Sequence, residues 1–318
     1  MRRSTSLVMV AGIGATLLGL AAVLNLGQGP VTVVRFTPPP TPTIAADARS
    51  TTVRSVPALL DALADDRLDE VVVADGTYVV SPASERRADS LWIGSRYASR
   101  TRAVVVRAET RGGVTFDGGG TASFGGISFQ EGAHHQTWDG FVFANGTPTS
   151  TGVVVFGGYN DGSAAPHHIT MRSLRFAASI RGSIPQDHDI YISATTHGTG
   201  GPHDLLFEDI QADGSGGIMS AFNFGHDWGD NAWNVTVRRL TAVNFDTAIV
   251  VWEGVLHDLL FEDITLTNST RFGVRYENGS DYRVVFRNVV SSGSGSQGFY
   301  SSLGTPVPGV TLSGCSFN

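Results

Sequence analysis

The hexapeptide Leu-Leu-Phe-Glu-Asp-Ile occurs at Leu205–Ile210 and again at Leu259–Ile264. Counted from Asp204 and Asp258, apolar residues follow at one, three and six positions. The same pattern, with Gln136 as its one polar exception, returns at five more reference points: His135, His168, Asn234, Arg283 and Gly309. Successive reference points lie 33, 36, 30, 24, 25 and 26 residues apart, which predicts a repeat of about 25 residues with insertions in the earlier copies.

Alternation of apolar and polar residues within each copy is the period of a strand rather than of a helix. A second short strand is expected in every copy but the last: Val153–Phe156, Ile190–Ser193, Ile218–Ala221, Ile249–Trp252, Val274–Glu277 and Phe299–Ser302. The segments between them are too short for helices, and 39 of 318 residues are Gly. The pattern therefore predicts an all-β solenoid, a parallel β-helix.

Val56, Leu59, Leu60 and Leu63 have helical spacing, and Asp65 follows them. We expect a short N-terminal helix here that caps the first coil and covers its open strand edge.

Three kinds of segment carry a resemblance to a known fold: Val56–Val80, Val104–Gly120, and repeats such as Asn234–Leu240 and Asp187–Ser193. They resemble the right-handed parallel β-helix proteins of the pectate-lyase-like superfamily. The resemblance spans residues 52–318 and implies a single right-handed parallel β-helix. That superfamily includes lyases, hydrolases, epimerases, phage tailspikes and non-catalytic surface proteins, so the fold does not select an activity.

The chain begins with Met1-Arg2-Arg3 and an apolar stretch, Leu7–Leu26, which together indicate export. We expect residues 1–29 to be a signal sequence or an N-terminal membrane anchor, residues 30–51 a Pro/Thr-rich linker, and residues 52–318 the β-helix domain. The protein is then extracellular, either secreted or anchored to the cell membrane by that first segment alone.

The formal net charge is −7, and all 22 basic residues are Arg. The balance argues against nucleic acid as a partner. The absence of Lys excludes a lysine base or a Schiff base. All nine histidines lie between His134 and His257, within the copies that carry the longest insertions, so we expect the chemistry in the middle coils.

The second strands should present one face outward. Stacked in register, they predict one outward row of Tyr191, Met219, Val250, Arg275 and Tyr300, and a neighbouring row of Ser193, Ala221, Trp252, Glu277 and Ser302. Aromatic rings stack on sugar faces and Arg forms a fork with a carboxylate, so this face suits an acidic polysaccharide. The predicted substrate-binding residues are Tyr191, His197, Trp228, Trp252 and Glu277; the alternative is that the tryptophans only pack under loops.

Asp187 and Asp189 are the sharpest catalytic candidates, since alternate strand residues lie about 7 Å apart on one side. That separation suits an inverting acid and base pair, although the two carboxylates could instead hold Ca²⁺ or bond to turns and backbone. His226 beside Asp227 is a second acid or base candidate, and Arg275 a third. No ligand spacing indicates a zinc site, and no cofactor other than Ca²⁺ is indicated.

These observations predict an exported protein that binds and cleaves or modifies a polysaccharide, as a lyase or a glycoside hydrolase. A non-catalytic, surface-anchored glycan-binding or structural β-helix is the alternative, because no family's catalytic motif can be matched residue by residue. The sequence does not indicate the glycan or the oligomeric state.

Overall fold

The structure of the chain is a computed structural model that describes residues 48–120, 126–147, 152–158, 164–177, 187–194, 200–215, 217–225, 231–252, 254–277, 282–304 and 306–318. Residues 1–35 form a separate unit from residues 36–318.

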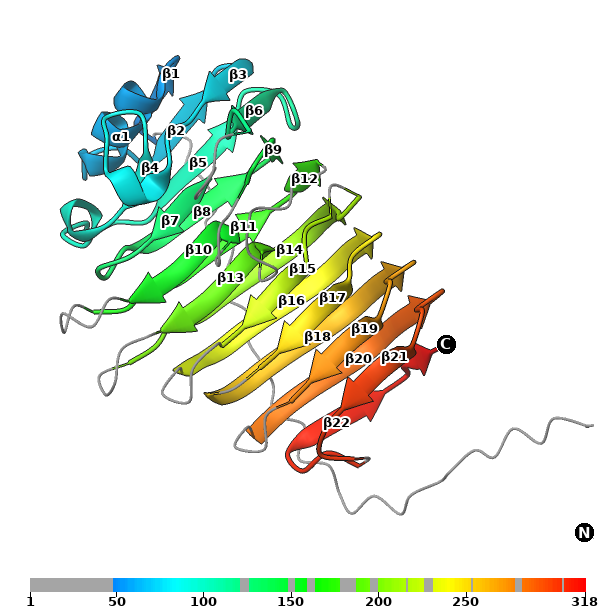
Figure 1. The fold of residues 1–318 in the computed structure, drawn as a ribbon. Coiled ribbons are helices and arrows are strands. Elements are labelled where there is room, and N and C mark those ends of the chain that lie inside the picture. The colour runs from blue at the N-terminus through cyan, green and yellow to red at the C-terminus, as the bar shows by residue number, and fades with distance from the viewer. Residues whose placement is uncertain are drawn as a thin grey trace, which may run out of the picture. The chain divides into compact units, whose positions relative to one another are not determined.

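The second unit is built from two parallel sheets that wind as the coils of one right-handed β-helix (Figure 1). The first sheet has eight strands: β4 (Leu91–Ile93), β7 (Ile127–Phe129), β10 (Gly152–Gly158), β13 (His188–Ala194), β15 (Ser220–Phe224), β17 (Thr247–Val251), β19 (Phe272–Tyr276) and β21 (Gln297–Ser301).

The second sheet has fifteen strands: β1 (Ser50–Val53), β2 (Glu70–Val73), β3 (Gly76–Val79), β5 (Val104–Ala108), β6 (Val114–Asp117), β8 (His134–Asp139), β9 (Phe141–Ala144), β11 (His167–Arg172), β12 (Arg175–Ala177), β14 (His203–Asp213), β16 (Asn231–Val243), β18 (Val255–Thr267), β20 (Tyr282–Ser292), β22 (Val310–Ser313) and β23 (Ser316–Phe317). In the N-terminal coils this sheet has two separate series of strands, one through β8 and β11 and one through β9 and β12. The two series join at β14, which pairs with both β11 and β12, because β14, β16, β18 and β20 each run through a corner without a break.

The corners are made by residues in the left-handed backbone region. Every reference point of the sequence repeat has a positive φ, between 52° and 58° for the six that are not Gly and 76° for Gly309. Five positions later a second corner follows in each coil, at Gly140, Ser173, Asp209, Arg239, Asp263, Asn288 and Gly314. Because Asn, Asp and Gly adopt this conformation most readily, their regular return marks where the chain bends.

A column of alternating charge runs across the fifteen-stranded sheet. In strand register it consists of Arg107, Asp139, Arg172, Glu208, Arg238, Glu262 and Arg287. Arg172 lies 2.9 Å from Asp139, and Arg238 lies 2.6 Å from Glu208. Opposite charges on neighbouring strands stabilise the pairing, so this column favours the observed register over a slipped one.

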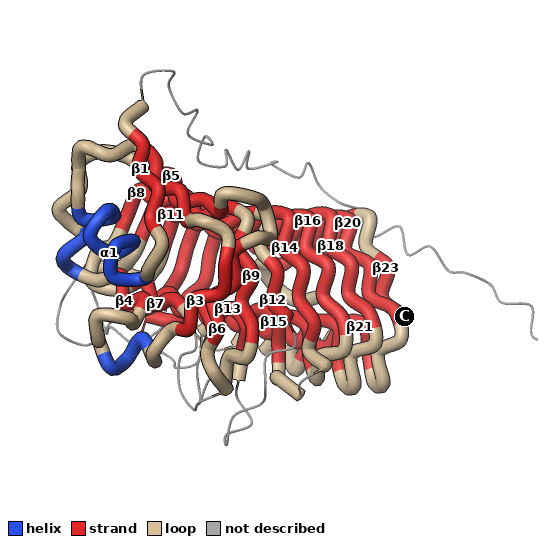
Figure 2. Tube along the Cα trace, turned by 90° about the horizontal axis from the view of Figure 1, so that it is seen from above, coloured by secondary structure: helices blue, strands red, loops and turns tan. Residues whose placement is uncertain are grey.

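Aromatic side chains fill the interior, where Phe261 stacks on Phe286 with ring centroids 4.6 Å apart and Phe224 meets Phe261 edge-on at 5.3 Å. The helix α1 (Val56–Ala64) lies beside β1 at the N-terminal end of the coils (Figure 2) and buries Leu59 and Leu63 against the core. Short 3₁₀ segments, η1 (Ala83–Glu85) and η2 (Ser95–Tyr97), flank β4.

The predicted right-handed parallel β-helix and its capping helix are confirmed. One second strand was predicted wrongly: the expected Ile218–Ala221 is in fact β15, Ser220–Phe224, because Phe222 and Phe224 are the side chains that fill the core there. The domain bounds stay a prediction, since residues 1–47 lie outside the described residues. Within the described ranges, no helix has the length and apolar character needed to cross a membrane.

The corner geometry predicts which substitutions the coils tolerate. Asn288 is exposed, has φ 54° and donates its Nδ2 to Asp263 Oδ1 at 2.9 Å. A β-branched residue is strained in this backbone region, so Asn288→Val should lower the free energy of unfolding by about 1–3 kcal/mol.

Urea denaturation measures this effect. The matched control is Thr265→Val, at an exposed strand position, which should change stability by less than about 0.5 kcal/mol. Equal midpoints for the two variants would contradict a strained corner at Asn288.

Candidate functional site

The outer face of the eight-stranded sheet carries one side chain per coil in a single row. Strand register gives its members as Trp92, Ser128, Val155, Tyr191, Asn223, Val250, Arg275 and Tyr300. The residues that alternate with them point into the core, for example Ile190 and Phe222. Asn223 therefore takes the place in this row that Met219 was predicted to hold.

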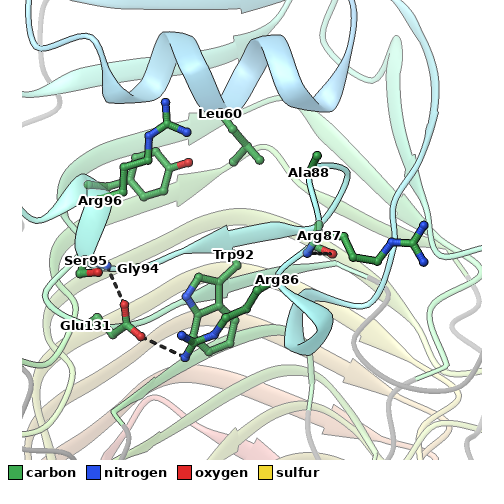
Figure 3. A pocket seen from close by; sticks show the side chains of 11 residues that line it. Leu60, Arg86, Arg87, Ala88, Trp92, Gly94, Ser95, Arg96 and Glu131 are labelled. Carbon is green, nitrogen blue, oxygen red and sulfur yellow. Dashed lines mark hydrogen bonds and ion pairs between the residues drawn. The ribbon is translucent and has the colours of Figure 1, made fainter.

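A cavity of about 330 Å³ opens at the N-terminal end of this row (Figure 3). Its walls hold Trp92, three arginines (Arg86, Arg87 and Arg96) and Glu131. The guanidinium of Arg86 lies 4.1 Å above the centre of the Trp92 ring, a cation–π contact. An aromatic ring beside several cationic groups is a surface that suits an anionic ring-shaped ligand.

Glu131 fixes the geometry of this cavity. One carboxylate oxygen accepts from Arg86 at 3.0 Å, and the other accepts from the backbone N–H of Ser95 at 2.8 Å. Gly94 permits the close approach, because a Cβ there would come within 2.5 Å of both Glu131 Oε2 and Trp92 Nε1. The arginine is thus held over the ring by a nearly buried carboxylate on a different coil.

A second arginine–tryptophan pair lies near the other end of the face. Arg275 of β19 lies 4.6 Å from the centre of the Trp252 ring and forms an ion pair of 2.7 Å with Glu277. Both charged side chains are mostly shielded, with 17% and 18% exposure. The structure therefore brings together three of the predicted site residues, Arg275, Trp252 and Glu277.

Between the two pairs the row is closed to solvent and holds Ser128, Val155, Tyr191, Asn223 and Val250. Asp187 and Asp189 have no exposed surface, and Tyr191 is only 8% exposed. His188 Nδ1 lies 2.8 Å from Ser220 Oγ, and its ring is parallel to that of Tyr191 at 5.5 Å. Burial of a polar side chain is costly unless it is hydrogen-bonded, as His188 and Ser220 are to each other. Together Asp187, His188, Asp189, Tyr191 and Ser220 form a buried polar cluster between the two pairs.

The roles predicted for Asp187 and Asp189 stay predictions, because neither carboxylate faces solvent. Ca²⁺ at this pair also stays a prediction: among the described residues, the group of acidic or histidine side chains that could share one ion is His168, His203 and Asp204. The other predicted site residues, His197, His226, Asp227 and Trp228, lie outside the described residues.

A column of stacked rings lines the first corner of the fifteen-stranded sheet. Its members are His134, His167, His203, Trp233, His257 and Tyr282, one from each successive coil. The rings of His167 and His203 are parallel with centroids 5.0 Å apart, and those of His203 and Trp233 are 4.5 Å apart. Trp233 of β16 belongs to this ring column rather than to the outer face of the eight-stranded sheet.

Burial and neighbouring imidazoles lower the pKa of His134 to about 4 and that of His167 to about 4. Both rings are therefore neutral at neutral pH, and the ring column carries little positive charge at its N-terminal end.

Sequence reasoning missed Arg86, Trp92 and Glu131, which precede the first recognised repeat. It also missed the ring column, although a signal was present: an aromatic or His residue stands directly before six of the seven reference points.

No protein-family model matches the chain, and a search of curated proteins found no match. Several solved structures are similar at low identity. The PL6 family alginate lyase AlyGC is 13% identical over 77% of this chain and 35% of the lyase, with a TM-score of 0.42. The catalytic domain of a GH87 α-1,3-glucanase in complex with nigerose is 10% identical over 87% of this chain and 70% of that domain, with a TM-score of 0.32.

The A-module of the mannuronan C-5 epimerase AlgE4 from Azotobacter vinelandii is 13% identical over 85% of this chain and 93% of that module, with a TM-score of 0.33. Similarities this weak assign no activity to this chain.

The low pKa of His134 predicts a pH dependence of stability. The unfolded state takes up a proton near the ordinary value of about 6.5, whereas the folded state resists protonation until about pH 4. The stabilising contribution is thus complete above pH 6.5 and is lost as the pH falls toward 4.

Replacing His134 with an aromatic residue that cannot take up a proton isolates this effect. His134→Phe should flatten the fall of the urea midpoint between pH 7 and pH 4 while leaving the midpoint at pH 8 close to that of the wild type. Identical pH profiles for the two proteins would show that His134 does not contribute.

Proposed function

We propose that this chain binds an acidic polysaccharide along the outer face of its eight-stranded sheet and cleaves or modifies it. The observation that carries the proposal is the pair of arginine–tryptophan–glutamate groups on that one face: Arg86, Trp92 and Glu131 at one end, and Arg275, Trp252 and Glu277 toward the other. Each group offers a flat aromatic surface and a guanidinium, the two features that recognise a sugar ring bearing a carboxylate or sulfate.

The spacing favours a polymer over a small molecule. Trp92 and Arg275 occupy the same outward row on strands that are six steps apart in the sheet, β4 and β19. At about 4.8 Å per step the two positions are separated by roughly 29 Å. One chain of several sugar units could contact both groups, and binding at two linked sites raises affinity beyond either alone.

The buried cluster between the two groups is where we place the chemistry. Asp189 and Tyr191 lie on the outer side of β13, in the middle of the row, and a carboxyl group and a phenol are both side chains that can serve as an acid or a base. Arg275 remains a candidate for neutralising the substrate's carboxylate.

One observation favours the alternative of a binding protein without turnover. Asp187 and Asp189 are both fully buried, so a substrate can reach them only if the residues above them move. The same two arginine–tryptophan groups would then hold a glycan without cleaving it.

We further propose that residues 1–29 direct export, that residues 30–51 act as a linker, and that the β-helix works outside the cell. Cell fractionation tests this proposal. The β-helix should be found in the medium or on the outer surface of the cell membrane, and its confinement to the cytoplasm would contradict the proposal.

Binding should depend on both arginines. Arg86→Gln and Arg275→Gln each remove a charge-assisted contact, so each should weaken affinity for an acidic polysaccharide about tenfold or more in a titration at low salt. The matched control is Arg283→Gln, because Arg283 also lies over an aromatic ring, Tyr282 at 4.5 Å, and pairs with a carboxylate, but on the other sheet.

An equal loss in all three variants would mean that only net charge matters, and the proposed face would be wrong. No loss in Arg86→Gln and Arg275→Gln would contradict it as well.

Turnover is tested on pectate, alginate, glycosaminoglycans and neutral glycans, with and without Ca²⁺. We expect a product from an acidic glycan, either an ultraviolet-absorbing unsaturated uronate from a lyase or new reducing ends without absorbance from a hydrolase. Asp189→Asn should abolish the product and leave glycan binding in place. Binding without any product in the wild type would establish the alternative.

A further inference from the structure

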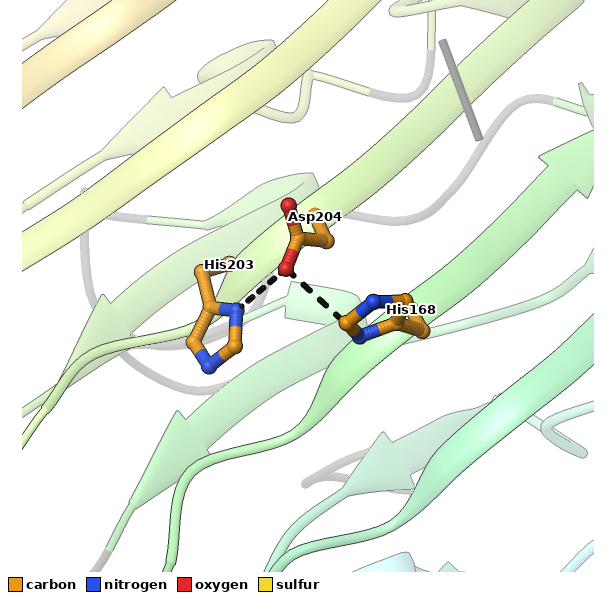
Figure 4. A group of neighbouring side chains, drawn as sticks. All are labelled: His168, His203 and Asp204. Carbon is orange, nitrogen blue, oxygen red and sulfur yellow. Dashed lines mark hydrogen bonds and ion pairs between the residues drawn. The ribbon is translucent and has the colours of Figure 1, made fainter. Parts of the chain in front are cut away.

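Three potential metal-ligating side chains converge at the first corner of the fifteen-stranded sheet (Figure 4). His203 Nδ1 lies 2.8 Å from Asp204 Oδ2, and His168 Nδ1, one coil earlier, lies 3.5 Å from the same oxygen. One ligand atom from each of the three residues lies within 4.8 Å of the other two. The group belongs to β11 and β14, away from the face proposed for the polysaccharide.

A second histidine–aspartate pair in the same column shows what the first one lacks. His257 Nδ1 lies 2.7 Å from Asp258 Oδ2, nearly the same geometry as His203 and Asp204. There, Arg283 of the next coil donates to both oxygens of Asp258 at 2.5 Å. The carboxylate of Asp258 is thus neutralised by a guanidinium.

Asp204 has no such partner among the described residues. In strand order Asn234 follows Asp204 at the position that Arg283 takes beside Asp258, and its uncharged amide donates to Asp204 Oδ1. On the preceding coil, the neighbour of Asp204 is His168, whereas the neighbour of Asp258 is Asn234. Two imidazoles and an amide therefore surround the Asp204 carboxylate, whereas Asp258 is paired with a guanidinium.

We propose that His168, His203 and Asp204 bind one divalent transition-metal ion of the Zn²⁺ or Ni²⁺ class. Two imidazole nitrogens with one carboxylate suit these ions, whereas Ca²⁺ and Mg²⁺ take oxygen ligands almost exclusively. A tetrahedral zinc ion with ligands at about 2.0–2.1 Å holds its donor atoms about 3.3 Å apart. The two separations from Asp204 Oδ2, 2.8 Å to His203 Nδ1 and 3.5 Å to His168 Nδ1, lie on either side of that value.

The ligands are held in place before any ion binds. The His203 ring is stacked between His167 and Trp233, and the His168 ring is stacked on His135 with centroids 4.8 Å apart. Rings fixed in this way lose little freedom on coordination, which favours binding.

The site is open to solvent on one side. The side chains of His168, His203 and Asp204 are 43%, 24% and 24% exposed. Three protein ligands leave a fourth coordination position for water or another donor. Catalytic zinc sites have this open position, whereas structural zinc sites have four protein ligands. A further nitrogen is close by, since His167 Nδ1 lies 2.8 Å from His168 Nδ1.

The test is calorimetric titration of the metal-free, full-length chain, purified without a polyhistidine tag, with ZnCl₂ and NiCl₂ at about pH 7.5. We expect one ion per chain, no binding of CaCl₂ at this site, and a rise in the melting temperature with Zn²⁺.

Three variants remove one ligand each and are chosen to keep the local backbone or ring packing. His168→Asn and Asp204→Asn keep a residue that tolerates the left-handed corner, where φ is 53° and 54°, and His203→Phe keeps the stacked ring. Each should weaken Zn²⁺ binding at least about 100-fold, since even loss of an outer partner of a metal ligand costs 10–100-fold. The matched control His257→Phe should stay within about twofold of the wild type.

Absence of Zn²⁺ and Ni²⁺ binding by the wild type would overturn the proposal. So would wild-type affinity in the three variants, because the ion would then lie elsewhere. Circular dichroism checks the fold of each variant; His168 is exposed, so His168→Asn keeps the test decisive if either of the other two fails to fold.

Discussion

Two left-handed corner residues, five positions apart, recur in seven successive coils, and the remaining architecture depends on them. In four of the seven coils the second corner leaves the strand unbroken, so β14, β16, β18 and β20 run through the bend as continuous strands. In the other three coils the strand is interrupted there, between β8 and β9, β11 and β12, and β22 and β23. A left-handed corner costs free energy for most side chains, and Asn, Asp and Gly reduce that cost. Because the corners align from coil to coil, the strand residues beside them stack in columns, with one residue from each coil.

The columns turn a one-dimensional repeat into surfaces with distinct chemistry. On the fifteen-stranded sheet, alternating charge from Arg107 to Arg287 stabilises the register, and the ring column lies beside the first corner. On the eight-stranded sheet, the same register brings Trp92, Tyr191 and Arg275 into one row although 183 residues separate the first from the last. The proposed polysaccharide face is thus a product of stacking rather than of any local motif.

The corners also account for what could be predicted from the sequence. The reference points at Asp204 and Asp258 were recognised by the apolar residues after them, and these positions are the first corners themselves. The capping helix was visible because Leu59, Leu60 and Leu63 share one face. The expected strand Ile218–Ala221 is wrong because a short apolar run after Gly217 resembles the other second strands, whereas the larger Phe222 and Phe224 are the residues of β15 that fill the core.

The site was harder to predict for physical reasons. Alternation assigns a side chain to a face but does not say whether that face is covered, so the full burial of Asp187 and Asp189 had no sequence signal. Arg275, Trp252 and Glu277 were found because they fall within recognised repeats. Arg86 and Glu131 were missed because 45 residues separate them, and only the winding of the first coils brings their side chains to 3.0 Å.

The most direct test of the central claim is a crystal structure of the protein with a bound acidic oligosaccharide of several sugar units. We expect density for the sugar chain along the outer row of the eight-stranded sheet, with rings against Trp92 or Trp252 and acidic groups on Arg86 or Arg275. Density confined to the fifteen-stranded sheet, or a bound chain that avoids both arginine–tryptophan pairs, would contradict it.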